Sequence, residues 1–274
     1  MFFDTHTHYD DKRFHKILPD LMEELKEKNI VYMINAARNV QSNERMKELG
    51  KRYPQMRRAV GRHPKDVDAN PENDAQVIAA LKAMLKDPDV CAVGETGFDL
   101  YHNADWARQE FWFREQISWA QEYNLPLILH LRGGMEEALS ILDEQFEKAS
   151  DIESLQGAES GCTMSRPYRG VFHCFTGDFA IASEYIRRGF LIGIGGKVTN
   201  PDNTELREAV KQMPLEAIVL ETDCPYLIPY GYKGTNHSLF LPMICDAVAE
   251  IKGISAKEVE ERTYQNAMRL FSLE

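Results

Sequence analysis

Short apolar runs alternate along this chain with longer stretches in which apolar residues return every three or four positions. Several of the short runs are apolar throughout, which is typical of parallel strands buried on both faces. We therefore predict eight strands, at Met1–His8, Val31–Ala37, Arg58–His63, Val90–Glu95, Pro126–His130, Gly170–His173, Phe190–Gly195 and Ala217–Asp223.

The stretches between these runs have the periodicity of amphipathic helices. Leu18–Lys28, for example, carries Leu18, Leu21, Met22 and Leu25 at helical spacing. Similar patterns cover Ala75–Leu85, Trp106–Tyr123, Asp202–Met213 and Ser255–Phe271. Eight strands that alternate with helices predict a TIM (β/α)8 barrel, with residues 1–274 as a single domain. A doubly wound open sheet is the alternative.

One stretch does not fit the alternating pattern. Asp151–Arg166 is polar and contains Gly157 and Gly161. It lies between the fifth helix and the sixth strand, and in a barrel that connection is at the face opposite the active site. We expect a surface insertion at 151–166.

Charge and cysteine usage narrow the class of protein. The 274 residues are 43% hydrophobic and carry a formal net charge of -11, so the overall field repels polyanions. A nucleic-acid substrate would need metal ions and local Lys or Arg residues. Five cysteines at irregular spacing, without a CxxC motif, favour a reducing cytosol over a disulfide framework.

The opening residues lack the basic and apolar regions of a signal peptide, and no apolar stretch reaches the ~18–20 residues of a membrane helix. We therefore expect a cytoplasmic protein without a membrane partner. Nothing in the sequence indicates an obligate protein partner.

Residues of metal-ligand type end five of the predicted strands. In a barrel the carboxyl ends of the strands meet at one mouth, whereas an open sheet spreads them along a line. Four imidazoles and two carboxylates are more than one tetrahedral ion needs, so we predict a pair of divalent ions. The candidate ligands are His6, His8, Glu95, His130, His173 and Asp223.

Four of the candidates at strand ends have features that bear on their chemical roles. His6 and His8 share one face of their strand because side chains alternate with a period of two. Glu95 lies between Gly94 and Gly97, which suits close approach by a ligand, and a carboxylate can bridge two cations. Asp223 is costly to bury without a partner, so we expect it to bind metal and to accept a proton from water.

Other residues are candidates for contact with a substrate. His63 ends the third strand and could contact substrate, protonate a leaving oxygen or simply make a local hydrogen bond. Arg132 lies two residues after His130 and could bind a phosphate with two hydrogen bonds. Lys233 and Asn236, in the segment after the last strand, are weaker candidates for substrate binding.

The same residues carry a resemblance to the TatD family of metal-dependent hydrolases. The matching motifs appear in family order over nearly the whole chain. They are Asp4–His8, Gly61-Arg62-His63-Pro64, Gly94-Glu95-Thr96-Gly97-Phe98-Asp99, His130-Leu131-Arg132, His173-Cys174-Phe175-Thr176-Gly177, Glu221–Leu227 and Asn266–Phe271.

The resemblance implies a TIM barrel of the metallo-dependent hydrolase type. It also implies that His6, His8, Glu95 and Asp223 hold one ion, and that Glu95, His130 and His173 hold the other. Members of the family are commonly described as DNases, including 3′ exonucleases, that use Mg²⁺ or another divalent ion. The segment Tyr232–His237 departs from the family pattern because it lacks an Arg and a Pro, and the 151–166 segment is also atypical.

The sequence leaves the metal and the substrate open. An imidazole-rich set suits Zn²⁺ or Mn²⁺, whereas Mg²⁺ prefers oxygen ligands. We predict a nuclease that cleaves phosphodiester bonds of DNA, at single strands or ends. An amide, lactone or ester hydrolase on the same barrel is the alternative, and a non-catalytic metal-binding protein is a third.

Overall fold

Eight parallel strands lie side by side in chain order, from β1 to β8. The computed structural model describes residues 1–67, 71–102, 105–155 and 169–273. Every predicted strand is present there, and β4 continues beyond Glu95 to Asp99. The strands are β1 (Phe2–Thr7), β2 (Ile30–Ala36), β3 (Met56–Val60), β4 (Val90–Asp99), β5 (Leu127–Arg132), β6 (Gly170–Phe172), β7 (Phe190–Ile194) and β8 (Ile218–Leu220).

The first and last strands meet and close the barrel. Thr7 forms a parallel bridge with Cys224. The Asp223 N–H donates to the His6 carbonyl at 3.0 Å, and the His8 N–H donates to the Cys224 carbonyl at 2.8 Å. The predicted TIM barrel is therefore confirmed. The open doubly wound sheet is wrong, because it would leave these two strands apart.

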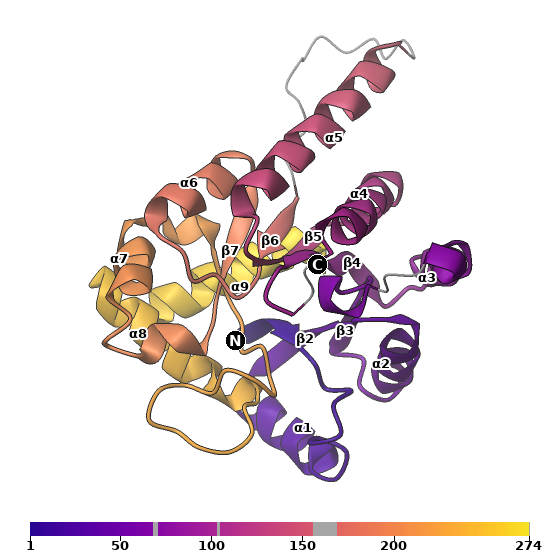
Figure 1. Cartoon of the computed structure of the whole chain (residues 1–274). Helices are drawn as coiled ribbons and strands as arrows, with labels where there is room; N and C mark the ends of the chain where they lie inside the picture. Colours follow the sequence, from indigo (N-terminus) through magenta and orange to yellow (C-terminus); the bar gives the residue numbers. More distant parts are fainter. Residues whose placement is uncertain (68–70, 103–104, 156–168, 274) are drawn as a thin grey trace.

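Helices surround the strands on the outside (Figure 1). Leu18, Leu21, Met22 and Leu25 of α1 are buried against the barrel, as their spacing predicts. The helices are α1 (Leu18–Glu27), α2 (Val40–Arg52), α3 (Asp74–Met84), α4 (Trp106–Glu122), α5 (Met135–Leu155), α6 (Phe179–Arg187), α7 (Thr204–Gln212), α8 (Leu241–Lys252) and α9 (Ala256–Phe271).

A compact apolar cluster fills the barrel interior. It joins side chains of strands on opposite sides, so it must lie inside the ring of strands. Its strand members are Phe3, Ile34, Ala59, Ala92, Ile128, Val171 and Val219. Phe271 of α9 packs on Phe3 with ring centroids 5.6 Å apart. This core supports the strand ends that carry the candidate ligands.

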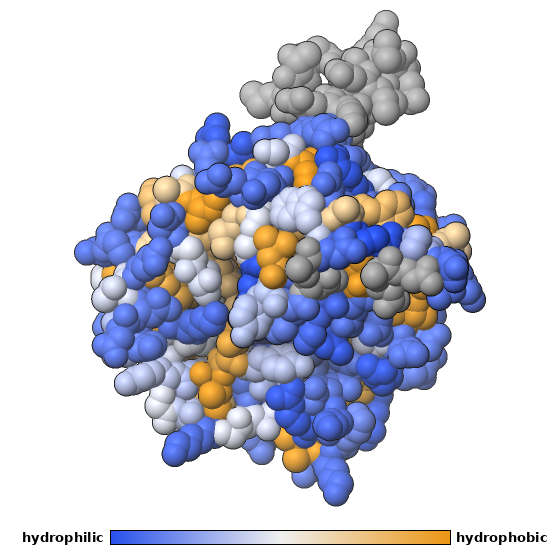
Figure 2. Space-filling view, viewed as in Figure 1, coloured by the Kyte–Doolittle hydropathy of each residue, from blue (hydrophilic) through white to orange (hydrophobic). Residues whose placement is uncertain are grey.

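The surface is mainly polar. The face seen in Figure 2 is predominantly hydrophilic, with apolar side chains scattered over it. None of the helices in the described part of the chain combines the length and the apolar composition of a membrane span.

Helix α5 changes one expectation from the sequence. It extends to Leu155, so the first five residues of the expected insertion at 151–166 are helical and not part of a loop. Figure 1 shows the end of α5 projecting beyond the other helices. Residues 156–166 lie outside the described residues, and the single-domain organisation of 1–274 stays a prediction.

Candidate metal centre and active site

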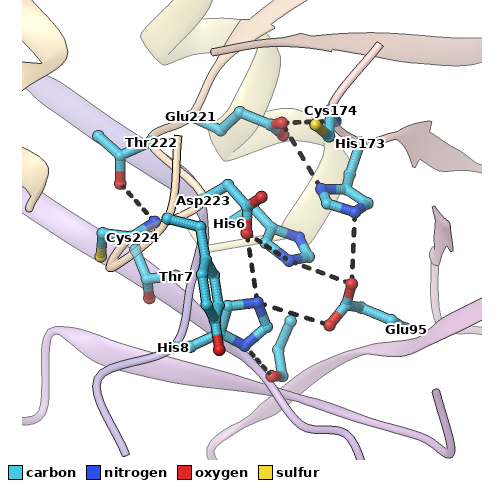
Figure 3. Close-up of polar contacts among 12 residues, drawn as sticks. His6, Thr7, His8, Glu95, His173, Cys174, Glu221, Thr222, Asp223 and Cys224 are labelled. Atoms are coloured by element: carbon cyan, nitrogen blue, oxygen red, sulfur yellow. Dashed lines mark hydrogen bonds and ion pairs between the residues drawn. The ribbon is translucent and has the colours of Figure 1, made fainter. Parts of the chain in front are cut away.

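The candidate ligands meet at the carboxyl end of the barrel, and Figure 3 shows five of them, namely His6, His8, Glu95, His173 and Asp223. Oε2 of Glu95 lies 3.5 Å from His6 Nε2, 3.3 Å from His130 Nδ1 and 3.3 Å from His173 Nε2. Its other oxygen, Oε1, lies 3.6 Å from His8 Nε2. One carboxylate therefore faces four imidazoles from three other strands.

Asp223 completes the group from the end of β8. Its Oδ1 lies 3.3 Å from His8 Nε2 and 3.9 Å from His6 Nε2. The residue has a φ of 54°, in the left-handed region that Asp tolerates better than most residues. Its side chain therefore approaches the histidines of β1 from the strand that closes the barrel.

The glycines near Glu95 have a packing role that the sequence did not indicate. A Cβ on Gly94 would lie 2.6 Å from the Ile128 carbonyl oxygen, and one on Gly97 would lie 2.4 Å from that of His130. These glycines therefore allow β4 to lie close to β5, and close approach by a ligand at Glu95 stays a prediction. The contact brings Glu95 and His130 together.

In three of the imidazoles, the ring nitrogen that points away from the cluster faces an oxygen acceptor. A proton on that outer nitrogen leaves the inner nitrogen of the neutral ring as an acceptor. His8 Nδ1 lies 2.9 Å from the Ala36 carbonyl, which can only accept, so its Nε2 carries the lone pair. His130 Nε2 lies 3.4 Å from Asp99 Oδ2, and His173 Nδ1 lies 3.6 Å from Glu221 Oε1. Carboxylates that face outer nitrogens in this way are a common support for metal-binding histidines.

His63 has the opposite arrangement. The Lys65 N–H donates to His63 Nδ1 at 2.9 Å, so the proton of the neutral ring is on Nε2. Burial, with the nearby His130 imidazole, holds the pKa of His63 well below its usual value and favours that neutral form. Nε2 lies 3.7 Å from Glu95 Oε2, so His63 offers a hydrogen-bond donor to the site.

Charges within the cluster keep the carboxylates ionised. Burial by itself raises the pKa of Glu95, but the imidazoles of His6 and His8 and the hydrogen bond to His130 outweigh it and hold that pKa well below its usual value. Burial also lowers the pKa of His173, but hydrogen bonding to Glu221 and Glu95 outweighs it and raises that pKa well above the usual value. The centre thus combines anionic carboxylate oxygens with imidazole nitrogens.

The donor set fits divalent ions. Both ring nitrogens of His6 and Oε1 of Glu95 are buried without a hydrogen-bond partner, which is costly unless a cation binds them. Two donors that each lie ~2.1 Å from a tetrahedral ion are ~3.4 Å apart, close to the separations around Glu95. Donor atoms converge in three overlapping groups: His6, His8 and Glu95; His63, Glu95 and His130; and His6, His173 and Glu221.

Comparison with known proteins shows the family to which the chain belongs. A family model described as TatD related DNase matches residues 3–272. The chain belongs to this TatD family. It is a hydrolase of that family, as the ordered motifs predict. The metal-dependent hydrolase YabD of Bacillus subtilis (strain 168) is 32% identical over 279 residues, which cover 100% of both proteins.

Two further relatives cover essentially the whole chain. The 3′-5′ ssDNA/RNA exonuclease TatD of Erwinia tasmaniensis is 29% identical, over 99% of this chain and 100% of its own. The crystal structure of YJJV, a TatD homologue from Escherichia coli K12, superposes with a TM-score of 0.87 and 24% identity, over 100% of this chain and 98% of its own. That structure supports the fold.

The structure adds a supporting carboxylate that the sequence analysis of this TatD-family chain missed. Glu221 is fully buried and faces His173 Nδ1, and its Oε1 also accepts from the Cys174 N–H at 2.5 Å. The available signal was its position two residues before Asp223, in the same strand-end motif. It links the end of β8 to the end of β6.

Asp4 is a second buried carboxyl that the sequence analysis passed over. It accepts hydrogen bonds from the Thr222 and Ser238 hydroxyls, each at 2.6 Å, and from the Thr222 N–H at 2.9 Å. Burial raises the pKa of Asp4 to about 7, against the lowering effect of these hydrogen bonds. Asp4 therefore joins β1 to β8 beside the ligands.

The three residues predicted to contact substrate differ in their exposure to solvent. Arg132 is exposed, and its guanidinium lies 3.9 Å from the centroid of the Tyr101 ring. Lys233 is also exposed. Asn236 is fully buried, and its amide donates to the carbonyls of Thr222, at 2.7 Å, and Tyr226. Asn236 thus holds the loop after β8, and a substrate contact for it stays a prediction.

Proposed function

We propose that this hydrolase holds two divalent ions around Glu95 and cleaves phosphodiester bonds of DNA, working from the 3′ end of single strands. The position of Glu95 carries the proposal, because its two oxygens face histidines from opposite parts of the barrel. The name of the Erwinia relative supports the choice of a single-stranded nucleic acid and of its 3′ end.

In this proposal the ligands divide into two sets that share Glu95. His6, His8, Glu95 and Asp223 hold one ion, and Glu95, His130 and His173 hold the other. When bound, the ions supply positive charge for a phosphate and lower the pKa of a water molecule. The imidazole-rich set favours Zn²⁺ or Mn²⁺ over Mg²⁺.

The remaining roles belong to the side chains themselves. The side chain of Asp223 is 13% exposed, against 2% for Glu95, so it is the carboxylate more open to a water molecule and accepts its proton. His63 donates its Nε2 proton to the scissile phosphate or to the leaving oxygen. Arg132 holds a phosphate at the mouth.

A small-molecule amide, lactone or ester hydrolase would need an apolar pocket near Phe98, Leu100 and Tyr101. Phe98 is instead fully buried and stacked on Trp106, at 4.0 Å between centroids. Tyr101 is exposed, and the guanidinium of Arg132 lies 3.9 Å from the centroid of its ring. The positive charge of Arg132 at this position favours a phosphate substrate. A non-catalytic metal-binding protein is disfavoured because the chain belongs to a family of metal-dependent hydrolases.

The cytoplasm is the compartment that we propose. Cys91, Cys174, Cys224 and Cys245 are unpaired thiols, which suits a reducing environment.

The test is hydrolysis of single strands labelled at the 3′ or the 5′ end. The protein is stripped with a chelator and then supplied with Mg²⁺, Mn²⁺ or Zn²⁺ in turn. We expect metal-dependent release of mononucleotides from the 3′ end, and none from a Glu95→Gln preparation purified in parallel. Absence of hydrolysis with every ion, or equal hydrolysis by the variant, would overturn the proposal.

A further inference from the structure

Two arginine–tyrosine stacks lie on opposite sides of the barrel mouth. The guanidinium of Arg13 lies 4.6 Å from the centroid of the Tyr226 ring, and that of Arg132 lies 3.9 Å from the centroid of the Tyr101 ring. The first pair joins the segments that follow β1 and β8, and the second joins the ends of β4 and β5. In a ring ordered from β1 to β8, these two places are diametrically opposed.

The first stack borders the ligand cluster directly. The Tyr226 ring meets the His8 ring edge-on, with centroids 5.9 Å apart. Tyr226 is 41% exposed, so part of this residue is open to solvent beside a candidate ligand.

The second stack reaches the cluster through a short chain of contacts. The Tyr101 ring lies edge-on to His102, at 4.9 Å, and His102 Nδ1 lies 2.7 Å from Asp99 Oδ2. The same Asp99 oxygen faces His130 Nε2. Tyr101 is 73% exposed. The two tyrosines thus flank the ligands from opposite sides.

The pairing of ring and guanidinium suits a single-stranded nucleic acid. Every base has a π-face that stacks on an aromatic ring, and Arg both stacks and binds phosphate. We propose that Tyr226 and Tyr101 are two base-stacking platforms that hold a single strand across the mouth, with Arg13 and Arg132 on the flanking phosphates. This inference rests on the proposed function and names how that site binds its substrate.

The two platforms differ in what surrounds them. Beside Tyr226 lies a hollow of about 370 Å³, which is within the ~300–1,000 Å³ range of small-ligand sites. Its lining includes the cations Lys12, Arg38 and Arg45. We assign the terminal nucleotide to this hollow, and an internal base of the strand to Tyr101.

Acidic residues also line the hollow, but their charges are balanced. The Asp10 carboxylate bonds to Arg45 at 2.8 Å, and Asp11 bonds to Arg13 at 2.8 Å. Lys12 adds positive charge to the same lining, whereas Arg38 pairs with Asp66, at 3.8 Å between Nε and Oδ2. The hollow therefore accepts a phosphate despite the acidic character of the whole chain.

The test uses the full-length, metal-loaded protein and short strands with phosphorothioate linkages, which slow hydrolysis. A fluorescent base, 2-aminopurine, is placed at the 3′ end, at the 5′ end or inside the strand, and its quenching on binding reports stacking. Each measurement is repeated in chelator, and the melting temperature of every variant is recorded.

We expect Tyr226→Leu to relieve quenching of one terminal base, and Tyr101→Leu to relieve quenching of an internal base. Each variant should weaken binding roughly tenfold, the effect of one lost base stack. Tyr226→Phe and Tyr101→Phe should keep the quenching. Tyr53→Leu is the matched control, because Arg52 lies 5.1 Å from the centroid of the Tyr53 ring at the far end of the barrel.

If quenching is unchanged in both Leu variants and both are folded, the proposal that these tyrosines are base-stacking platforms is wrong. Absence of quenching by the unmodified protein, with metal and in chelator, would also contradict it. Loss of terminal and internal signals together in each variant would overturn the assignment of the hollow. Failure of the proposed function can be distinguished from failure of this inference, because the protein would then quench the base but show no metal-dependent hydrolysis.

Discussion

The Nδ1 atom of His130 lies 3.1 Å from the Nε2 atom of His173. The outer nitrogens of both rings face carboxylates, those of Asp99 and Glu221. If both outer nitrogens carry the proton, two lone pairs point at one another, and a cation between them relieves that repulsion. A proton or a bound cation between these two nitrogens therefore stabilises the pair.

Removal of the central carboxylate should empty the centre. Glu95→Ala takes away the group that faces four imidazoles, so we expect loss of activity and of bound metal in elemental analysis. Glu122→Ala is the matched control, because that carboxylate pairs with Lys82 on the surface of α4. Full occupancy by two ions in Glu95→Ala would contradict the sharing of Glu95.

Asp223→Asn should impair turnover more than folding. The amide keeps the shape of the side chain, but it cannot take a proton and binds cations weakly. We expect kcat to fall by roughly a hundredfold or more, as for other lost acid–base groups, with little change in melting temperature. Near-normal turnover would remove Asp223 from the role of base.

Glu221→Gln should weaken metal binding without abolishing it. Loss of a carboxylate that orients a metal-binding imidazole typically costs ~10–100-fold in affinity for the ion. We expect activity at low metal concentration to fall and to recover when the ion is in excess. Failure to recover, in a variant that melts normally, would mean that Glu221 does more than position His173.

His63→Gln should separate catalysis from metal binding. Because His63 presents a donor, we expect metal content to stay unchanged while kcat falls roughly a hundredfold. Its pKa is lowered, so the neutral donor is already present below ~6.5, and activity should not decline as pH rises through that value. A fall above pH 6.5 would instead indicate that the imidazolium is required.

Chelation should lower the melting temperature. An ion that binds the folded chain alone stabilises it in proportion to the logarithm of its concentration over Kd. We expect Zn²⁺ or Mn²⁺ to raise the melting temperature of the stripped protein, and to raise that of Glu95→Ala much less. Equal shifts in the two proteins would place the stabilising ion elsewhere.

The strand ends and their ligands could be predicted because both signals are local. An apolar run followed by His or Asp marks a buried strand that stops at a polar site. Placement of the ligands at one mouth follows from barrel topology alone, and their individual roles stay predictions.

Contacts between distant segments could not be predicted in this way. Gly94 and Gly97 permit the approach of β5, and nothing near them in sequence indicates it. Glu221 supports a histidine on another strand, and Asn236 holds backbone carbonyls of its own loop. Each of these side chains has its use only after the chain has folded.

The seam that closes the barrel also joins two of the metal-ligand segments. His6 and His8 come from one end of the chain and Asp223 from near the other, and backbone hydrogen bonds across the seam set their spacing. A chain still being synthesised, or one whose first strand has detached, cannot assemble this ligand set. We therefore expect the activity proposed for this site only after the first and last strands have paired.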